Sequence, residues 1–250
     1  MSSRSSARRA DMKERRRQRQ RQERRNWLLI VGGVLLVILA IIIIPTVYKS
    51  LTPPAPVGDF KQITPVARPQ ENGTSMGDPN APVKIDSWED FQCPACQQFT
   101  ETVEPQVVDT YIKTGKVFYT FHQYPFIDTN SVAKESHQAA NASMCAAEQN
   151  RFWDFRDIVF ANWQGENQGY LSDPRLTAFA QSIGLDMTKF NSCFKANKYS
   201  SQIQADYDKG QQMGVSGTPS VFVNGVLLKP GFIPTFADVQ QAVDKALAGK

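Results

Sequence analysis

The sequence predicts an α/β domain, and three observations support this prediction. Val83–Trp88 and Val117–Phe121 have the composition of short strands, and the segment between them has a helical pattern from Cys93 onward. Such a β-α-β unit implies two parallel strands with a right-handed crossover. Residues 130–214 have a helical pattern, and two further strands with a last helix close the chain. The predicted order is therefore β-α-β, a helical insertion over about residues 130–214, and β-β-α.

The predicted helices follow from their start and stop signals. The first is expected to run from Cys93 to about Lys113 with a kink at Pro105, because proline removes a helical hydrogen bond. Within the insertion, Asp173-Pro174 is a typical helix start and Asp186 is a typical N-cap. The expected helices of the insertion are Ser131–Gln149, Phe152–Trp163, one from Asp173 that ends before Gly184, one capped by Asp186, and Tyr199–Met213.

A β-hairpin and a helix are expected to complete the domain. Ser220–Val223 and Val226–Leu228 are apolar runs separated by Asn224-Gly225, a preferred sequence for a two-residue hairpin turn. Thr235–Ala248 then has the pattern of a helix. These elements supply the β-β-α part of the predicted order.

Charge is distributed unevenly along the chain of 250 residues, whose formal net charge is +4. Residues 1–26 carry ten arginines and one lysine against three acids, a net charge of +8, so the remaining residues carry −4. This basic tail is expected to be a solvated determinant of membrane topology, and no nucleic acid partner is expected.

An apolar segment follows the tail. Residues 27–44 are eighteen residues without a charge, which as a helix span about 27 Å, close to the thickness of a bilayer core. With Trp27 and Tyr48 as interfacial aromatics, residues 27–48 are predicted to form a single N-terminal transmembrane helix. The positive tail predicts a cytoplasmic N-terminus and an extracytoplasmic domain at the cell membrane. A cleaved signal peptide is the alternative, but the apolar run exceeds the usual length and no small-x-small site follows promptly.

Residues 49–76 are expected to link the membrane segment to the domain. They are rich in proline and weakly patterned, which is typical of an extended, semi-rigid spacer. The globular domain is therefore expected to cover residues 77–250.

Cys93 and Cys96 form a Cys-Pro-Ala-Cys motif between the first strand and its helix. At a helix N-terminus, unpaired N–H groups and the helix dipole stabilise a thiolate at Cys93. A disulfide between residues three apart adds little stability, so it is more plausible as an exchangeable bond than as a structural one. A zinc site is the other alternative, but it would need two more ligands, and the chain has only His122 and His137 and no second motif of this kind. No metal is expected.

These features resemble the DsbA-like thiol-disulfide oxidoreductases, which have a thioredoxin fold with a helical insertion, and among them the membrane-anchored bacterial branch. The resemblance covers about residues 77–248. It rests on the stretches Asp90–Cys96, Ala142–Gln149 with Phe152-Trp153, and Gly214–Pro219 with Phe222–Gly225.

The resemblance implies a catalytic site. Cys93 would be the nucleophile and Cys96 the resolving thiol of a redox-active disulfide, and Pro219 would be a cis proline facing them. Because proline lacks an N–H group, the backbone of Thr218 would be free to bond an extended substrate next to Cys93. No bound cofactor is implied, because the cysteine pair itself carries the electrons.

The expected function is the introduction of disulfides into exported proteins that carry free thiols. The resemblance implies that a membrane quinone reductase of the DsbB or VKOR type reoxidises the cysteine pair. A reductase or isomerase with the opposite electron flow is one alternative, and a thiol-based metal-binding or chaperone module is another.

The proton carrier of the site is left open by the sequence. Relatives often have a buried acid six residues before the nucleophile, and Ser87 occupies that position here. Glu89 or Asp86 could replace it, but strand alternation does not decide which of the two faces inward. The motif also lacks a histidine between its cysteines, which predicts a weaker oxidant than a relative that has one.

Cys145 and Cys193 are expected to form a structural disulfide within the helical insertion. An even number of cysteines in an extracytoplasmic domain favours pairing. Two free buried thiols are the alternative.

Overall fold

The computed structural model describes residues 24, 26–34, 36–41, 43 and 57–249. The chain divides into two units, residues 1–54 and 55–250. In the first unit, residues 26–34 and 36–41 are helical. Among the described residues, no helix combines the length and the apolar character that crossing a membrane requires. Positions 35, 42 and 44–48 of the predicted span, most of the basic tail and residues 49–56 lie outside the described residues.

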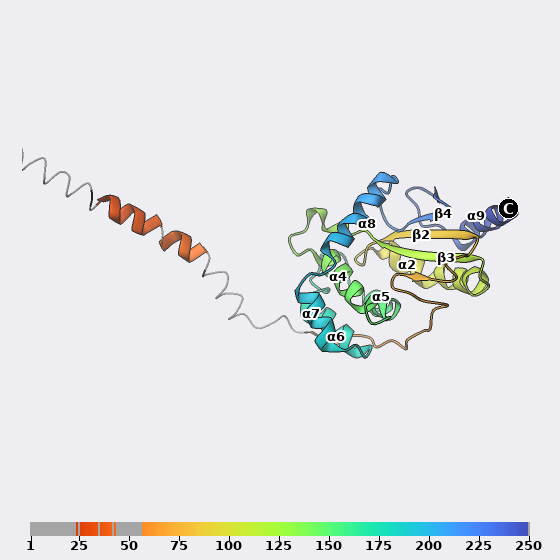
Figure 1. Ribbon diagram of the computed structural model, residues 1–250, viewed down its shortest axis with the longest axis horizontal. Helices are drawn as coiled ribbons and strands as arrows, with labels where there is room; N and C mark the ends of the chain where they lie inside the picture. Colours follow the sequence, from red (N-terminus) through yellow and green to blue (C-terminus); the bar gives the residue numbers. More distant parts are fainter. Residues whose placement is uncertain (1–23, 25, 35, 42, 44–56, 250) are drawn as a thin grey trace, which may run out of the picture. The chain divides into compact units, whose positions relative to one another are not determined.

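A mixed sheet is the centre of the second unit (Figure 1). Within the described residues it has five strands in the order β1-β3-β2-β4-β5. The strands are β1 (Ser75–Met76), β2 (Val83–Glu89), β3 (Val117–Gln123), β4 (Ser220–Val223) and β5 (Val226–Leu227). β2 and β3 are parallel and the other pairs are antiparallel, so the predicted β-α-β unit and hairpin are confirmed. β1 was not expected, because two residues are too few to show a period.

The helices lie close to their predicted positions. They are α2 (Pro94–Thr102), α3 (Glu104–Val107), α4 (Glu135–Ala147), α5 (Phe152–Ala161), α6 (Asp173–Ser182), α7 (Met187–Lys195), α8 (Ser200–Gln212) and α9 (Phe236–Ala248). The break between α2 and α3 falls at Val103, two residues before Pro105, and a π-helical turn follows α3. Figure 1 shows α4 to α7 gathered at one side of the unit, whereas α2 and α9 lie along the sheet.

Capping residues define two of the helix starts. The Asp186 carboxylate accepts hydrogen bonds from the N–H groups of Thr188 and Lys189, which confirms the predicted N-cap of α7. Thr235 and Asp238 form a reciprocal capping box at the start of α9.

The two faces of β2 contribute to different hydrophobic clusters. Val83 and Ile85 belong to the main core, whereas Trp88 points to the other face and packs in a smaller cluster with Phe222. α8 covers this second face at very short range. A Cβ atom at Gly210 of α8 would lie 2.8 Å from the Trp88 ring, so only glycine fits there without a shift. Odd-numbered and even-numbered residues of β2 therefore point to opposite faces of the sheet. This alternation decides the role of each side chain near the end of the strand.

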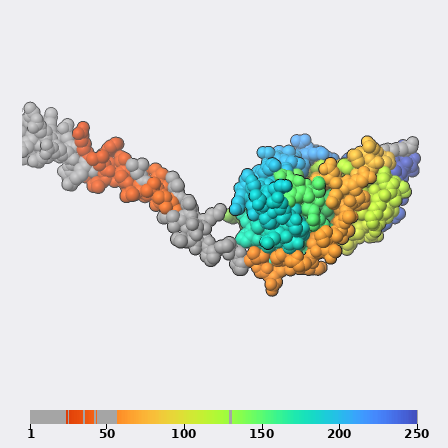
Figure 2. All heavy atoms as spheres, turned by 60° about the horizontal axis from the view of Figure 1, so that its bottom comes forward, coloured from red at the N-terminus to blue at the C-terminus, as the bar shows by residue number. Residues whose placement is uncertain are grey.

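The structure differs from the prediction of a free linker over residues 49–76, in the second half of that segment. Residues 57–72, here called the N-terminal strap, pack against the helical insertion. Lys61 exchanges two hydrogen bonds with the Asn162 side chain, at 2.6 and 2.9 Å, and the Phe60 ring packs edge-on against Phe179 at 5.0 Å. Figure 2 shows this part of the chain as an orange band along the folded unit. The strap is thus part of the domain and not a free spacer, because its backbone at Lys61 and its apolar side chain Phe60 find partners there.

Candidate functional site

The local structure around Cys93 places its sulfur at the start of a helix. Cys93 is the N-cap of α2 with extended backbone angles, φ −76° and ψ 119°. Its N–H donates to the Asp90 carbonyl at 3.0 Å, and Pro94 occupies the first helical turn. Proline is suited to this position because the N–H group that it lacks would have no helical partner there. The free N–H groups of the turn are consequently directed at Cys93.

The Cys93 thiol is strongly acidified. Its pKa is lowered from the ordinary 9.0 to about 6, chiefly by a hydrogen bond from the Cys96 thiol. Burial opposes this shift, but the Thr218 hydroxyl and the N–H groups of Cys96 and Ala95 add to it. The Thr218 hydroxyl is buried and lowers the pKa of Cys96 as well. Most Cys93 side chains are therefore thiolates at neutral pH.

Cys96 has the opposite character. It is fully buried in α2, and burial raises the pKa of its thiol well above the ordinary range. The negative charges that form on Cys93 and Glu89 raise it further. Both cysteines are free thiols in this structure. The motif thus combines one sulfur that is easily ionised with a second that holds its proton.

A loop from the far end of the chain completes the sulfur site. The Thr218–Pro219 peptide bond is cis, as the resemblance implies. In its thiol form, Cys93 Sγ donates to the Thr218 carbonyl at 3.2 Å, across 125 positions of sequence. The loop therefore lies directly against the sulfur.

A small cavity adjoins this loop. It has a volume of about 210 Å³ and contains no charged residue among those that line it. Ala95 of the motif lines one part and Phe232, whose side chain is 77 % exposed, lines another. The cavity thus offers an uncharged lining next to the motif.

The structure identifies which acid lies beneath the cysteines. Glu89 is fully buried, whereas the Asp86 side chain is partly exposed and accepts a hydrogen bond from His122 at 2.7 Å. Ser87 and Glu89 share one face of β2, and the Ser87 hydroxyl donates to Glu89 Oε1 at 2.7 Å. The Tyr119 hydroxyl donates to the same oxygen at 3.0 Å. Ser87 thus occupies the expected position of the acid, and the carboxyl comes from two residues further along the same face.

Burial raises the pKa of Glu89 to about 7. The Arg156 guanidinium lowers it and the Glu104 carboxylate raises it, but both effects are smaller than that of burial. A carboxyl with such a pKa changes its protonation state at neutral pH.

A buried ion cluster surrounds this part of the core. Arg156 of α5 is fully buried and donates from both terminal nitrogens to Glu104, and one of these nitrogens also contacts Asp157 at 2.8 Å. Arg68 of the N-terminal strap binds the other oxygen of Asp157 at 2.8 Å. The two guanidinium groups thus balance Glu104 and Asp157, and among the described residues no ion pair is formed by Glu89. The sequence alone gives no sign of this cluster, because Arg156 lies within a helix whose pattern is mainly aromatic.

Cys145 and Cys193 are joined in a disulfide between α4 and α7. Their sulfur atoms are 2.02 Å apart and their Cα atoms 5.8 Å apart. Both residues are buried, so this disulfide is shielded from external thiols.

The histidines lie apart from the cysteine motif. The His122 ring stacks on Trp88 with a centroid distance of 4.2 Å and contacts Asp86 and Asp206. His137 lies in α4. Within the described part of the chain, no cluster of three or more Cys, His, Asp or Glu side chains is arranged to hold a metal ion.

Comparison with known proteins agrees with this geometry. The thioredoxin family profile matches residues 70–245. The probable disulfide bond formation protein D of Bacillus cereus is 30 % identical over 175 residues, which cover 69 % of this chain and 78 % of that protein. Disulfide bond formation protein D of Bacillus subtilis is 27 % identical over 183 residues, 70 % of this chain and 77 % of that protein.

A solved structure shares the fold. The oxidised BdbD from Bacillus subtilis superposes with a TM-score of 0.63 at 23 % identity, covering 77 % of this chain and 100 % of that chain. At this identity the likeness concerns the fold, a thioredoxin domain with inserted helices. Taken with the family match and the relatives, it shows that the chain belongs to the thioredoxin family as a DsbA-like thiol-disulfide oxidoreductase.

Proposed function

We propose that this chain introduces disulfides into exported proteins by dithiol-disulfide exchange through Cys93 and Cys96. The acidified Cys93 sulfur at the start of α2 carries the proposal, because a low pKa makes it a good leaving group. When one sulfur of the reduced cysteine pair is a stabilised thiolate, the reduced form is favoured over the disulfide form. The pair consequently accepts electrons readily, as an oxidant must.

The proposed reaction begins with the Cys93–Cys96 disulfide. A substrate thiolate attacks Cys93 Sγ, which breaks the Cys93–Cys96 bond and forms a mixed disulfide, and Cys96 takes up a proton as it leaves. A second substrate thiolate then attacks the substrate sulfur of the mixed disulfide and releases Cys93 as a thiolate. The substrate has lost two electrons and gained a disulfide, and the cysteine pair is reduced. Thr218 and Pro219 flank the substrate backbone during both steps.

A membrane quinone reductase of the DsbB or VKOR type is proposed to reoxidise the pair. The names of the relatives describe disulfide bond formation, which requires an acceptor for the electrons after every cycle. No bound cofactor of the chain itself is needed for the exchange.

Anchoring in the cell membrane is part of the proposal. The apolar stretch 27–48 behind a tail with a net charge of +8 supports a single span with the catalytic domain on the extracytoplasmic side.

The direction of electron flow can be tested with the full chain purified in a mild detergent. Incubation with a reduced, unfolded protein that contains paired cysteines is expected to convert its thiols to disulfides, and a variant lacking both Cys93 and Cys96 is expected to do nothing. In cells, thiol alkylation should find the pair mostly oxidised. A mostly reduced pair would instead indicate a reductase or isomerase.

Glu89 is proposed to transfer the proton of Cys96. As the buried thiolate leaves, it needs a proton, and a nearby carboxyl with a pKa of about 7 can supply it at neutral pH. In the reverse step, ionised Glu89 accepts the proton while Cys96 attacks the mixed disulfide. This reverse step should accelerate as the pH rises through about 7.

Glu89→Gln is expected to slow the attack of Cys96 by roughly 100-fold or more near pH 7.5, because general-base assistance is lost. The measurement is the pH profile for release of glutathione from a mixed disulfide with Cys93. The profile of the variant should lack the rise through pH 7. Asp86→Asn is the matched control, since Asp86 faces His122, and it should keep the wild-type profile. An unchanged profile in Glu89→Gln would exclude this role.

A further inference from the structure

Gln92, the residue directly before Cys93, is bonded at four points to the helical insertion and to the turn that precedes it. Its side chain is completely buried. Gln92 Nε2 donates to Asp128 Oδ1 at 3.2 Å and to Ser136 Oγ at 2.8 Å. Gln92 Oε1 accepts from the N–H of Asn167 at 2.7 Å, and the Gln92 carbonyl accepts from Trp163 Nε1 at 2.6 Å. A neutral buried amide with so many partners is held in a single orientation.

The partners of Gln92 come from the turn that precedes the insertion and from two separate parts of the insertion. Asp128 lies in the 3₁₀ turn Ile127–Asn130, Ser136 begins α4, and Trp163 and Asn167 lie in the segment after α5. One side chain thus ties the loop that carries Cys93 to elements that follow it by 36 to 75 positions.

Asp90 completes the anchoring of the same loop. Its Oδ1 accepts from the Gln92 N–H at 2.8 Å and from the Ser136 hydroxyl at 2.5 Å, and its Oδ2 accepts from the N–H of Ile127 at 3.0 Å. The Cys93 N–H in turn donates to the Asp90 carbonyl. The turn from Asp90 to Cys93 is therefore fixed by hydrogen bonds within it and by hydrogen bonds to Ser136 and Ile127.

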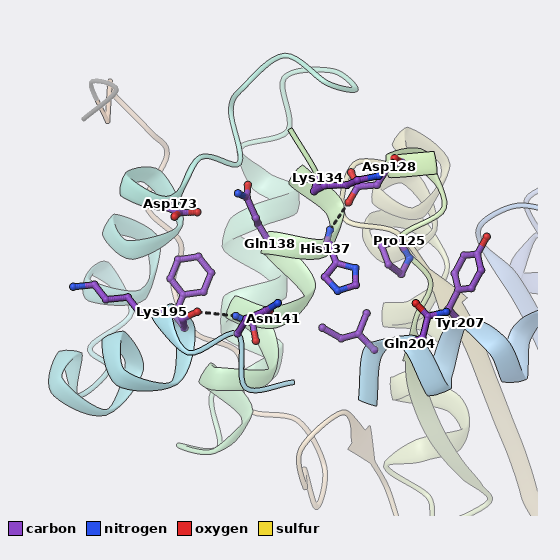
Figure 3. Close-up of a pocket in the computed structure, with 13 residues that line it drawn as sticks. Pro125, Asp128, Lys134, His137, Gln138, Asn141, Asp173, Lys195, Gln204 and Tyr207 are labelled. Atoms are coloured by element: carbon purple, nitrogen blue, oxygen red, sulfur yellow. Dashed lines mark hydrogen bonds between the residues drawn. The ribbon is translucent and has the colours of Figure 1, made fainter. Parts of the chain in front are cut away.

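The anchor for Gln92 is itself rigid. The Asp128 carboxylate accepts from the N–H groups of Ser136 and His137, at 3.0 and 2.7 Å, so it caps the N-terminus of α4 from outside. Figure 3 shows Asp128 and His137 at the wall of a cavity of about 580 Å³, with Lys134 beside them. Gln92 is not among the residues that line this cavity, and its side chain is fully buried.

We propose that Gln92 is the positioning residue of the nucleophile: its bonds to the insertion hold Cys93 at the start of α2, where the N–H groups of Ala95 and Cys96 reach the sulfur. Gln92 carries no charge, so it acts through geometry. The inference rests on the proposed exchange at Cys93 and assigns to the helical insertion a part in it. The charged groups that face Gln92 are Asp90 and Asp128.

Gln92→Met in the full chain tests the proposal, because methionine keeps the length of the side chain and removes its hydrogen bonds. The readout is the rate of alkylation of reduced Cys93 by iodoacetamide as a function of pH, followed at Cys93 by peptide mass spectrometry. The midpoint, expected at about 6 in the unaltered chain, should rise by about one pH unit, which corresponds to a tenfold change in the ratio of thiol to thiolate. The rate of disulfide exchange near pH 6 should fall in parallel.

Gln123→Met is the matched control. Gln123 is also a buried glutamine, with 1 % of its surface exposed, and it joins β3 to Ser143 of α4 at 3.1 Å. It should lower the melting temperature without moving the Cys93 midpoint. If Gln92→Met does not fold, Ser136→Ala replaces it as the test variant, because this substitution removes one hydrogen-bond partner of Gln92 and one of Asp90.

The outcomes separate this inference from the proposed function. A folded Gln92→Met variant with the wild-type midpoint and exchange rate would overturn the positioning role, and so would an equal shift in Gln123→Met. A wild-type chain with an acidic Cys93 that exchanges no disulfide would instead overturn the proposed function, since alkylation does not depend on exchange.

Discussion

Cys96→Ser is expected to trap substrate proteins as covalent adducts on Cys93, whereas Cys93→Ser is expected to trap none. The reason is that the two sulfurs differ in acidity and accessibility. Cys93 has a pKa lowered to about 6 and contacts the Thr218 carbonyl, while Cys96 is fully buried. An incoming disulfide can therefore react with Cys93, but without Cys96 the mixed disulfide that forms cannot be resolved from within the chain.

The adducts can be followed in cells on non-reducing gels. They should run as a ladder above the full chain in Cys96→Ser and collapse to one band after reduction. Both variants are expected to lose all measurable oxidation of a reduced test protein. The Cys145–Cys193 disulfide remains in both and serves as an internal control for folding. Equal trapping by the two variants would contradict the assignment of Cys93 as the sulfur that forms the mixed disulfide.

The strands and helix starts could be predicted from local sequence because local signals define them. Ser220–Val223 with the Asn224-Gly225 turn became β4 and its hairpin, and Asp186 caps α7 as expected. Such features depend on residues within a few positions of each other, so a single sequence is sufficient to identify them.

Other features depend on partners that are distant in sequence. The Pro-rich composition of the strap favoured a spacer, but Lys61 pairs with Asn162, 101 positions away. β1 consists of two residues whose only strand-like property is their pairing with β3. Neither composition nor period contains this information, because packing against the rest of the fold decides it.

The functional site likewise has features that local sequence predicts and features that depend on distant partners. The motif could be predicted from its local spacing and context, and the Thr218-Pro219 pair from the family resemblance. The identity of the acid could not, because it depends on which face of β2 lies under α2, and the structure selects Glu89 over Asp86 by burial. The role proposed for Gln92 could not be predicted from the sequence either, since its hydrogen-bond partners Ser136 and Asn167 follow it by 44 and 75 positions.

Removal of the second disulfide is expected to destabilise the domain by about 4 kcal/mol. The bond joins residues 48 positions apart, and a crosslink over a loop of this size lowers the entropy of the unfolded chain by about that amount. For a domain of this size, 4 kcal/mol corresponds to a fall in melting temperature of about 8–16 °C. The double variant Cys145→Ala/Cys193→Ala avoids a single free thiol that could pair with Cys93. Thermal unfolding followed by circular dichroism measures the effect.

The same variant tests whether the two cysteine pairs act independently. Cys145 and Cys193 are buried between α4 and α7, and none of the hydrogen bonds that acidify Cys93 comes from these helices. The pH midpoint for alkylation of Cys93 should therefore stay unchanged while the melting temperature falls. A fall of less than about 2 °C would mean that helix packing alone holds the insertion together. A shifted midpoint would mean that the disulfide supports the anchor of Gln92 on α4, and that stability and reactivity are coupled through that helix.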